Sequence, residues 1–299
     1  MDILLSINKK YILVAAVLIN SIIVNNDSKI NIHIMHDDLE DDEKKFLSSF
    51  FCENDKCELF FYKMNEFMFK RVEKIGSNRW PITVYYRLLA PFILDTDIER
   101  VLYLDADIVV NGSLTELYEM DLSQEMVAMC EDTFVNDKVE FRKRLNIPMP
   151  YIYYNSGVVL MNLKRIRDEY SSTDIYEIAE HYYDKLLFPD QDILNILFCS
   201  KCATVDYRKY NFICSYQRES KKNLLQKGKG AIVFHFAGGD YHKPWELNYL
   251  GMYHDVYWKY AIDIMGKTRE RKCFWSNKLL KPLFVVKKRI ELFAEFHCK

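Results

Sequence analysis

The feature that most constrains the fold is an alternation of short apolar runs with longer helical patterns in the first third of the chain. The strand-like runs are residues 2–7, 30–35, 57–62 and 100–105, and the helical patterns between them are residues 11–24, 38–51 and 82–94. Such alternation indicates an α/β fold with a mostly parallel sheet covered by helices on both faces. A doubly wound sheet binds its ligand at the carboxyl ends of its strands. We therefore expect a site at residues 105–107, where the last of these runs ends.

The second half of the chain is less regular. It predicts strands at residues 125–132 and 155–163, helices at 173–187 and 190–199, and a strand in "AIVFHFAGG" (231–239) that enters a glycine-bearing loop. No internal repeat or low-complexity linker interrupts the pattern. We expect one domain over residues 1–265 and a tail of different charge balance over residues 266–299.

Composition narrows the class of protein. With 49% hydrophobic and 28% charged residues the chain can form a sizeable core, and its net charge of −2 predicts no general attraction to nucleic acid. Cys199 and Cys202 have CxxC spacing, but no second such pair accompanies them, which favours reduced thiols in a cytoplasmic setting over a zinc site. Residues 11–24 follow Lys9 and Lys10 as the core of a signal peptide would, yet their length and flanks favour a buried helix.

The run "RVLYLDADIVV" (100–110) places two carboxylates at the end of an apolar stretch. In an extended strand Asp105 and Asp107 project to the same face, where their repulsion is costly without a cation between them. Carboxylate oxygens suit Mg²⁺ or Mn²⁺, and such an ion suits a bound diphosphate. The alternative is a pair of loop aspartates ahead of a helix that Ser113 begins, with Glu116 completing a capping box.

Six blocks of sequence, in order, resemble the retaining nucleotide-sugar glycosyltransferases of family eight, which include bacterial lipopolysaccharide α-galactosyl- and α-glucosyltransferases and glycogenin. The blocks are "YYRLLAPFIL", "RVLYLDADIVVNGSLTELYEMDL", "YYNSGVVLMNLKRIR", "FPDQDILN", "YNF" and "HFAGGDYHKPW". The resemblance covers residues 1–265 and implies a GT-A fold. It also implies donor-binding roles for Asn8, Tyr11, Arg87, Asp105, Ala106, Asp107, Asn155, Ser156, Gly157, Gly238 and Lys243.

In this family a histidine completes the metal site with the two aspartates of the DxD motif. The resemblance therefore implies that Asp105, Asp107 and His235 bind Mn²⁺ or Mg²⁺ and leave positions for diphosphate oxygens. Lys243 would reach the donor diphosphate, although the loop after His235 is two residues longer than the family pattern. His242, inside that longer loop, is an alternative ligand.

The nucleotide would lie beyond the first strand, at "SINKKY". The resemblance implies that Tyr11 stacks on uracil and that Asn8 hydrogen-bonds its edge, where bacterial members often carry aspartate. An amide can both donate to and accept from the base. The alternative for Tyr11 is simply the first residue of a buried helix.

The sugar-binding and catalytic residues are expected in three further blocks. An arginine in an apolar helix needs an anionic or polar partner, so Arg87 lies either near the donor or in a structural salt bridge. Asn155 and Ser156 begin a strand at the pocket, and Gly157 would let a sugar ring approach the backbone. The resemblance implies three catalytic residues. Asp190 would hold the donor-sugar hydroxyls, the Gln191 amide would lie next to the anomeric carbon, and Asp132 would lie on the acceptor side. Because it precedes an apolar helix, Asp190 could instead be an N-cap.

The tail from 278 to 296 mixes aliphatic and aromatic residues with lysine and arginine. Such a segment can lie in a membrane interface or pack as a terminal helix on its own domain, and its basic charge favours peripheral contact with the inner face of the cytoplasmic membrane.

The expected function is metal-dependent, retaining transfer of galactose or glucose from a UDP-sugar to a bacterial surface glycan, such as lipopolysaccharide or capsule, by same-face attack. Two alternatives remain from the residues: a phosphatase of the haloacid dehalogenase type, which also uses a DxD motif but on its first strand, and a noncatalytic nucleotide-sugar or glycan-binding protein.

Overall fold

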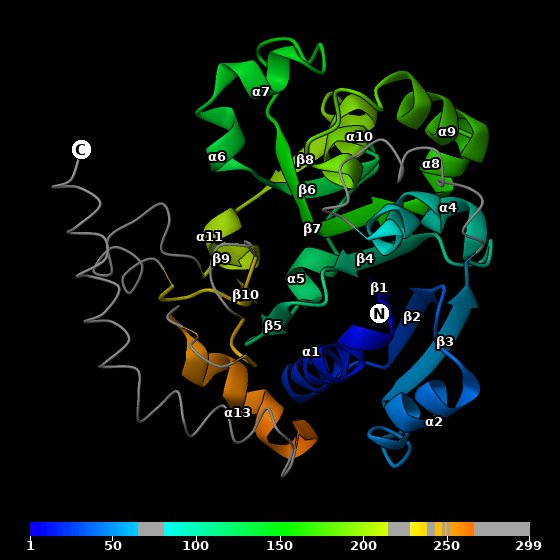
Figure 1. Cartoon of the computed structure of the whole chain (residues 1–299), viewed down its shortest axis with the longest axis vertical. Helices are drawn as coiled ribbons and strands as arrows, with labels where there is room; N and C mark the ends of the chain where they lie inside the picture. The colour runs from blue at the N-terminus through cyan, green and yellow to red at the C-terminus, as the bar shows by residue number, and fades with distance from the viewer. Residues whose placement is uncertain (65–80, 215–227, 238–242, 247–248, 250–251, 266–299) are drawn as a thin grey trace, which may run out of the picture.

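The structure is a computed structural model that describes residues 1–64, 81–214, 228–237, 243–246, 249 and 252–265. Within these residues the centre is a seven-stranded sheet of order β3-β2-β1-β4-β7-β6-β8 (Figure 1). Its strands are β1 (Asp2–Ser6), β2 (Ile30–His36), β3 (Cys57–Lys63), β4 (Arg100–Leu104), β6 (Val127–Glu131), β7 (Tyr154–Asn162) and β8 (Cys202–Val205). Only β7 runs antiparallel to its neighbours in this sheet, so the mostly parallel sheet predicted from the sequence is confirmed.

A second, three-stranded sheet within the described residues lies beside the carboxyl end of β4. It has the order β5-β10-β9, with β5 (Ile108–Val110), β10 (Val233–His235) and β9 (Phe212–Ile213). Because β4 ends at Leu104 and β5 begins at Ile108, the run 100–110 is two strands in two sheets, joined by a turn. The expectation that Asp105 and Asp107 share a face of one extended strand is therefore wrong.

The helices alternate with the strands of the large sheet, as expected. They are η1 (Lys9–Tyr11), α1 (Ile12–Asn25), α2 (Asp41–Ser49), η3 (Ile82–Leu89), α4 (Ala90–Ile93), α5 (Thr115–Tyr118), α6 (Thr133–Asn136), α7 (Val139–Lys143), α8 (Leu163–Glu169), α9 (Ser172–His181), α10 (Pro189–Phe198), α11 (Tyr207–Tyr210) and α13 (His254–Met265). The single helix predicted over 82–94 is a 3₁₀ helix followed by one α-helical turn. Pro91 lies at the start of α4, where a proline ring fits, whereas inside a continuous helix it would remove a hydrogen bond.

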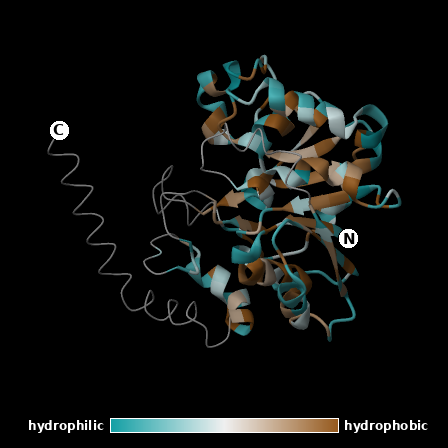
Figure 2. Ribbon diagram, turned by 45° about the vertical axis from the view of Figure 1, so that its right-hand side comes forward, coloured by the Kyte–Doolittle hydropathy of each residue, from teal (hydrophilic) through white to brown (hydrophobic). Residues whose placement is uncertain are grey.

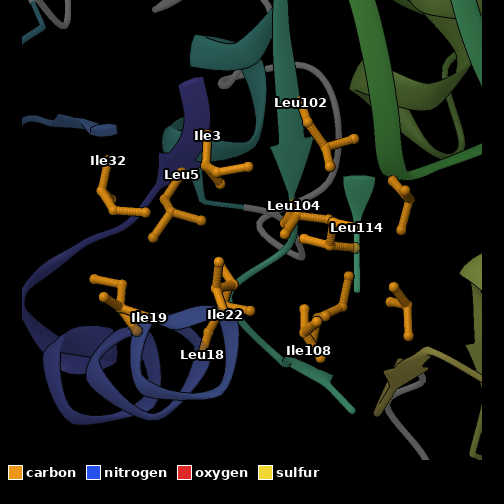
Figure 3. Packing of buried hydrophobic residues seen from close by; sticks show 14 of the residues in the cluster. Ile3, Leu5, Leu18, Ile19, Ile22, Ile32, Leu102, Leu104, Ile108 and Leu114 are labelled. Atoms are coloured by element: carbon orange, nitrogen blue, oxygen red, sulfur yellow. The ribbon is translucent and has the colours of Figure 1, made fainter. Parts of the chain in front are cut away.

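Helices cover both faces of the large sheet (Figure 1). On one face α1 is buried almost all round, as expected for a helix that is apolar on every side and lies between the sheet and α13. Figure 3 shows its residues Leu18, Ile19 and Ile22 near the strand residues Ile3, Leu5, Leu102 and Leu104. Residues of η3, α4, α8 and α10 pack on the other face. In Figure 2 brown, hydrophobic segments gather in the strands and in α1, while the outer helices carry more hydrophilic residues.

Two sequence alternatives are settled by this fold. Residues 11–24, compared above with a signal peptide, form the buried helix that was expected. The helix after the DxD motif begins at Thr115 with Leu114 at the N-cap, and the Ser113 hydroxyl accepts from the N–H of Thr115. The capping box of Ser113 and Glu116, which the alternative reading of the motif required, does not form.

The remaining observations concern cysteines, membranes and the tail. The six cysteines in the described residues are free, and burial raises the pKa of the Cys202 thiol. No helix in the described part of the chain is long and apolar enough to cross a bilayer. The tail over residues 266–299, expected to be basic, amphipathic and helical, lies outside the described residues.

Candidate active site

Three side chains that can bind a cation meet at the junction of the two sheets. Asp105 and Asp107 come from the turn after β4, and His235 ends β10, where sheet pairing sets it opposite Ile108. His235 Nε2 is 3.2 Å from Asp107 Oδ1 and 3.6 Å from Asp105 Oδ2. One ligand atom from each of the three residues lies within 4.8 Å of the others, and no other group of this kind was found in the described residues.

The other nitrogen of the His235 ring is held by a chain of amides. Nδ1 lies 2.8 Å from Asn211 Oδ1, and Asn211 Nδ2 donates to Asn155 Oδ1 at 2.8 Å. The Asn155 oxygen also accepts the backbone N–H of Gly157, which fixes both amide orientations because a backbone nitrogen can only donate. Nδ1–H therefore donates to Asn211, and in the neutral ring the Nε2 lone pair faces the two carboxylates. Two carboxylates and an imidazole oriented in this way fit Mn²⁺ or Mg²⁺.

Lys243 reaches this site despite the longer loop that precedes it. Its Nζ donates to Asp107 Oδ2 at 2.8 Å and to the carbonyl of Phe236 at 2.5 Å. Burial alone would raise the pKa of Asp107, but Lys243 and His235 outweigh it and hold that pKa well below its usual range. Burial would lower the pKa of Lys243, yet the Asp107 charge raises it. The site thus keeps a carboxylate and an ammonium side by side.

The His235 ring leaves no room for a side chain at Gly157. A Cβ atom at position 157 would lie 2.8 Å from Nδ1 of that ring and 3.0 Å from Asp105 Oδ2. The sequence suggested that this glycine leaves room for a sugar. In the structure the room beside it is filled by two of the side chains of the cation site.

Arg87 lies between the buried carboxylate of Asp190 and the partly buried carboxylate of Asp105. Its Nη1 is 2.9 Å from Asp105 Oδ1 and donates to the Ser156 carbonyl, and its Nε is 3.3 Å from Asp190 Oδ2. The guanidinium also covers the ring of Tyr103 at 4.0 Å, and the hydroxyl of that tyrosine donates to Asp105. Burial raises the pKa of Asp190, and the Arg87 charge opposes the shift. The alternative that Asp190 is the N-cap of α10 is wrong, because Phe188 occupies that position.

Gln191 lies at the first turn of α10 with all four hydrogen-bonding positions of its amide filled. Its Oε1 accepts from Asn155 Nδ2 at 3.0 Å and from the backbone N–H of Ser156 at 3.1 Å. Its Nε2 donates to Asp132 Oδ2 and to the Tyr153 hydroxyl, each at 3.3 Å. Asp132 also caps α6 through its other oxygen. Gln191, Asp132, Asn155 and Ser156, all expected from the sequence, are thus brought into contact.

The residues expected to bind the nucleotide, Asn8 and Tyr11, make contacts with the protein itself. Asn8 caps η1 by accepting the N–H of Lys10. Tyr11 is the N-cap of α1, its ring lies edge-on to Trp245 at 6.4 Å, and burial raises its pKa. Ala106 packs on the core between the two aspartates. Gly238 and His242 lie outside the described residues.

The sequence comparisons decide the family. A family model described as "Glycosyl transferase family 8" matches residues 2–248. The chain belongs to glycosyltransferase family 8. This membership confirms the resemblance found in the six sequence blocks.

Two of the relatives that this chain resembles are named as lipopolysaccharide glucosyltransferases. A lipopolysaccharide 1,2-glucosyltransferase of Escherichia coli is 30% identical over 247 residues, which span 80% of this chain and 71% of the relative. Lipopolysaccharide glucosyltransferase WaaO of Escherichia coli strain K12 is 27% identical and covers 94% and 81% of the two chains. The solved structure of galactosyltransferase LgtC in complex with donor and acceptor sugar analogs has a TM-score of 0.73 at 22% identity, over 91% of this chain and 99% of LgtC. The GT-A-like fold expected for family 8 is confirmed.

Several residues around this family 8 site were not anticipated from the sequence. Asn211 lies inside the block "YNF", so its signal was present, but nothing local shows that it orients His235. Tyr103 lies within the continuous buried run of β4 and looks like core. Asp192 follows Gln191 in the block "FPDQDILN", but no spacing in the sequence shows that Tyr153 and Arg144 join it beside that amide.

Proposed function

We propose that this family 8 chain is a metal-dependent, retaining glycosyltransferase that moves glucose or galactose from a UDP-sugar to a bacterial surface glycan. The observation that carries the proposal is the meeting of Asp105, Asp107 and His235, with Lys243 beside them, at the carboxyl end of β4. Carboxyl ends of strands are where α/β sheets bind ligands. The names of the lipopolysaccharide glucosyltransferase relatives support the class of acceptor.

The donor diphosphate is held by positive charge. Asp105, Asp107 and His235 would hold Mn²⁺ or Mg²⁺, which neutralises charge on the departing UDP. Lys243 adds a second positive charge next to that position, and Arg87 a third on the other side of Asp105. Because the leaving group is stabilised by charge, the reaction needs no protonating acid.

The sugar would lie between this cluster and Gln191. Asp190 would bind its hydroxyl groups, and the Gln191 amide would face the anomeric carbon. The carboxylates near this amide each have a protein partner, since Asp190 Oδ2 lies 3.3 Å from Arg87 Nε and Asp132 accepts from Gln191. This favours same-face attack by the acceptor over a covalent carboxylate intermediate, with Asp132 on the acceptor side. Asn8 and Tyr11 would bind the uracil.

The decisive experiment is release of UDP from UDP-glucose and UDP-galactose in the presence of Mn²⁺. We expect Asp105→Asn or Asp107→Asn to abolish it, because each removes a charged ligand. Asp121→Asn is a matched control, since among the described residues that exposed carboxylate accepts hydrogen bonds from nearby Ser123 and lies apart from the cation site. Unchanged Mn²⁺-dependent turnover in both site variants would refute the proposal. Phosphate release from simple phosphoesters would indicate a phosphatase, and donor binding without turnover would indicate a binding protein.

We further propose that residues 1–265 form the catalytic domain and that the basic tail over residues 266–299 brings it to the cytoplasmic face of the membrane. The basic and apolar composition of the tail supports this placement. Co-sedimentation with anionic vesicles, compared between the full chain and one with the tail lysines and arginines neutralised, tests it. Equal sedimentation of the two would contradict it.

A further inference from the structure

A line of buried polar side chains runs from Gln191 away from the cation site. Arg144, which follows α7, donates from Nη1 to Asp192 Oδ2 at 2.9 Å and from Nη2 to Asp192 Oδ1 at 2.7 Å. The Tyr153 hydroxyl donates to the same Oδ1. That hydroxyl in turn accepts from Gln191 Nε2 at 3.3 Å. Three side chains from different segments are therefore connected in series to the amide.

Asp192 is placed so that it cannot touch a substrate. Its side chain has no exposed area. Besides Arg144 and Tyr153, it accepts the backbone N–H groups of Leu187 at 2.8 Å and Phe188 at 3.0 Å. A carboxylate has about four acceptor positions, and here they are filled. Asp192 therefore acts on the site only through the groups that it holds.

The carboxylate fixes the direction of the Tyr153 hydroxyl. A hydroxyl rotates freely, and it can donate to either neighbour unless one of them is much the stronger acceptor. The charge-assisted bond to Asp192 is the stronger, so the proton lies on that side and the oxygen lone pairs face Gln191. Burial and the Asp192 charge raise the pKa of Tyr153, which keeps that proton in place. The two-pronged Arg144 contact prevents the carboxylate from turning.

The Gln191 amide gains a defined rotation from this arrangement. Its oxygen is held by Ser156 N–H and Asn155, and its nitrogen by Asp132 and the Tyr153 oxygen. Without the hydroxyl, one amide hydrogen has no partner on that side and the amide plane can swing about its last torsion. A swing of this kind alters the face of the amide that the reacting sugar would meet.

We propose that Arg144, Asp192 and Tyr153 are positioning residues that hold the Gln191 amide in the orientation that glycosyl transfer needs. The inference rests on the proposed function, because it gives Gln191 its place beside the anomeric carbon. The proposal extends the site into the segment between β6 and β7, because residues at both ends of this segment contact the Gln191 amide. Asp132 opens the segment and Tyr153 ends it, and the N–H of Asp132 donates to the Tyr153 carbonyl at 3.0 Å.

The test uses Tyr153→Phe, which removes only the hydroxyl, with Tyr154→Phe as the matched control. The Tyr154 hydroxyl bonds to Thr204 on β8 instead. With Mn²⁺ and UDP-glucose or UDP-galactose, Tyr153→Phe should lower kcat for UDP release about tenfold, the effect of one lost hydrogen bond in the transition state. KM for the donor should not change. Tyr154→Phe should keep the wild-type kcat.

Arg144 supplies an independent variant. Arg144→Lys retains a charge but loses the two-pronged contact, so its kcat should fall between that of the wild type and that of Arg144→Met. The inference is overturned if Tyr153→Phe and Tyr154→Phe have equal kcat, or if kcat in Tyr153→Phe falls only together with a rise in KM and a fall in Tm. If the wild type releases no UDP from either donor, the proposed function fails first and the inference falls with it.

Discussion

Replacing Gly157 by alanine should displace His235 without removing any side chain from the cation site. The added Cβ would lie closest to Cε1 of the ring and 2.8 Å from Nδ1, whereas ordinary van der Waals contact begins at 3.4 Å, so the ring must retreat by more than about 0.6 Å. Metal–ligand distances tolerate only about 0.2 Å. The retreat also disturbs the bond from Nδ1–H to Asn211. Alanine at this position therefore weakens the metal site through packing alone.

The size of the effect follows from ligand geometry. Loss of support for a metal-binding histidine weakens metal affinity by about 10- to 100-fold. At free Mn²⁺ of about 100 times the wild-type Kd, bound metal stabilises the wild type by about 2.7 kcal/mol, and a 100-fold weaker variant by about 0.4 kcal/mol. At about 2 to 4 °C per kcal/mol, the rise in Tm caused by Mn²⁺ should shrink from about 5–11 °C to about 1–2 °C.

The assay is a thermal melt with UDP present, with and without Mn²⁺. Gly112→Ala is the control, because an alanine Cβ there meets first the side chain of Ile232, at 3.2 Å. That variant should keep the full Mn²⁺ shift. A Gly157→Ala protein that is folded and keeps the wild-type shift would refute the reasoning, and so would a Gly112→Ala protein that loses it.

Three further predictions follow from other contacts. Asn211→Leu removes the acceptor for the Nδ1–H group of the metal-binding histidine, so Mn²⁺ affinity measured by calorimetry should fall about 10- to 100-fold, and unchanged affinity would contradict the role given to Asn211. Arg87→Met leaves the buried carboxylate of Asp190 and the partly buried one of Asp105 without their shared partner and should lower the free energy of unfolding in urea by about 3–5 kcal/mol. The control Arg165→Met, whose partner Glu169 is on the surface, should cost less than about 1 kcal/mol, and similar losses in the two variants would count against a buried pair. Burial raises the pKa of Asp2, but hydrogen bonds led by the one from His33 lower it overall, so its contribution to stability is present above its ordinary pKa of about 4 and is lost as the pH falls through the folded value. Urea melts from pH 6 to pH 3 should therefore show the difference between wild type and Asp2→Asn shrinking in acid, and a constant difference would contradict this linkage.

The fold was predictable because its signals are local. Apolar runs of strand length between helical patterns predict β1 to β4 and the helices around them, and burial of one apolar layer after another leaves few other arrangements. The interruption at Pro91 was predictable in principle, since proline tolerates only the first turn of a helix. The short α6 and α7 segments show no clear helical spacing of apolar residues, so their sequence does not predict them.

The candidate site was predictable only where a motif names its residues. Asp105 and Asp107 stand out because charge interrupts an apolar run, but the expected geometry of one continuous strand was wrong. Asp190 has the sequence of a helix cap, and only its contact with Arg87 shows that it belongs to a buried charge cluster. A contact of this kind depends on how η3 packs against α10, which no local pattern encodes.

By itself the sequence determined the α/β alternation, the family and the two carboxylates at the end of β4. The family resemblance named His235 as their partner, but only the tertiary structure shows how it meets them: the antiparallel pairing of β10 with β5 sets it opposite Ile108. Only the tertiary structure places Asn211, which parallel pairing of β9 with β10 brings beside the histidine ring. Arg144 reaches Gln191 through Asp192 and Tyr153 only after the segment between β6 and β7 has folded over α10. Strand register and packing bring together residues that are far apart in the chain. No short stretch of sequence determines either the register or the packing.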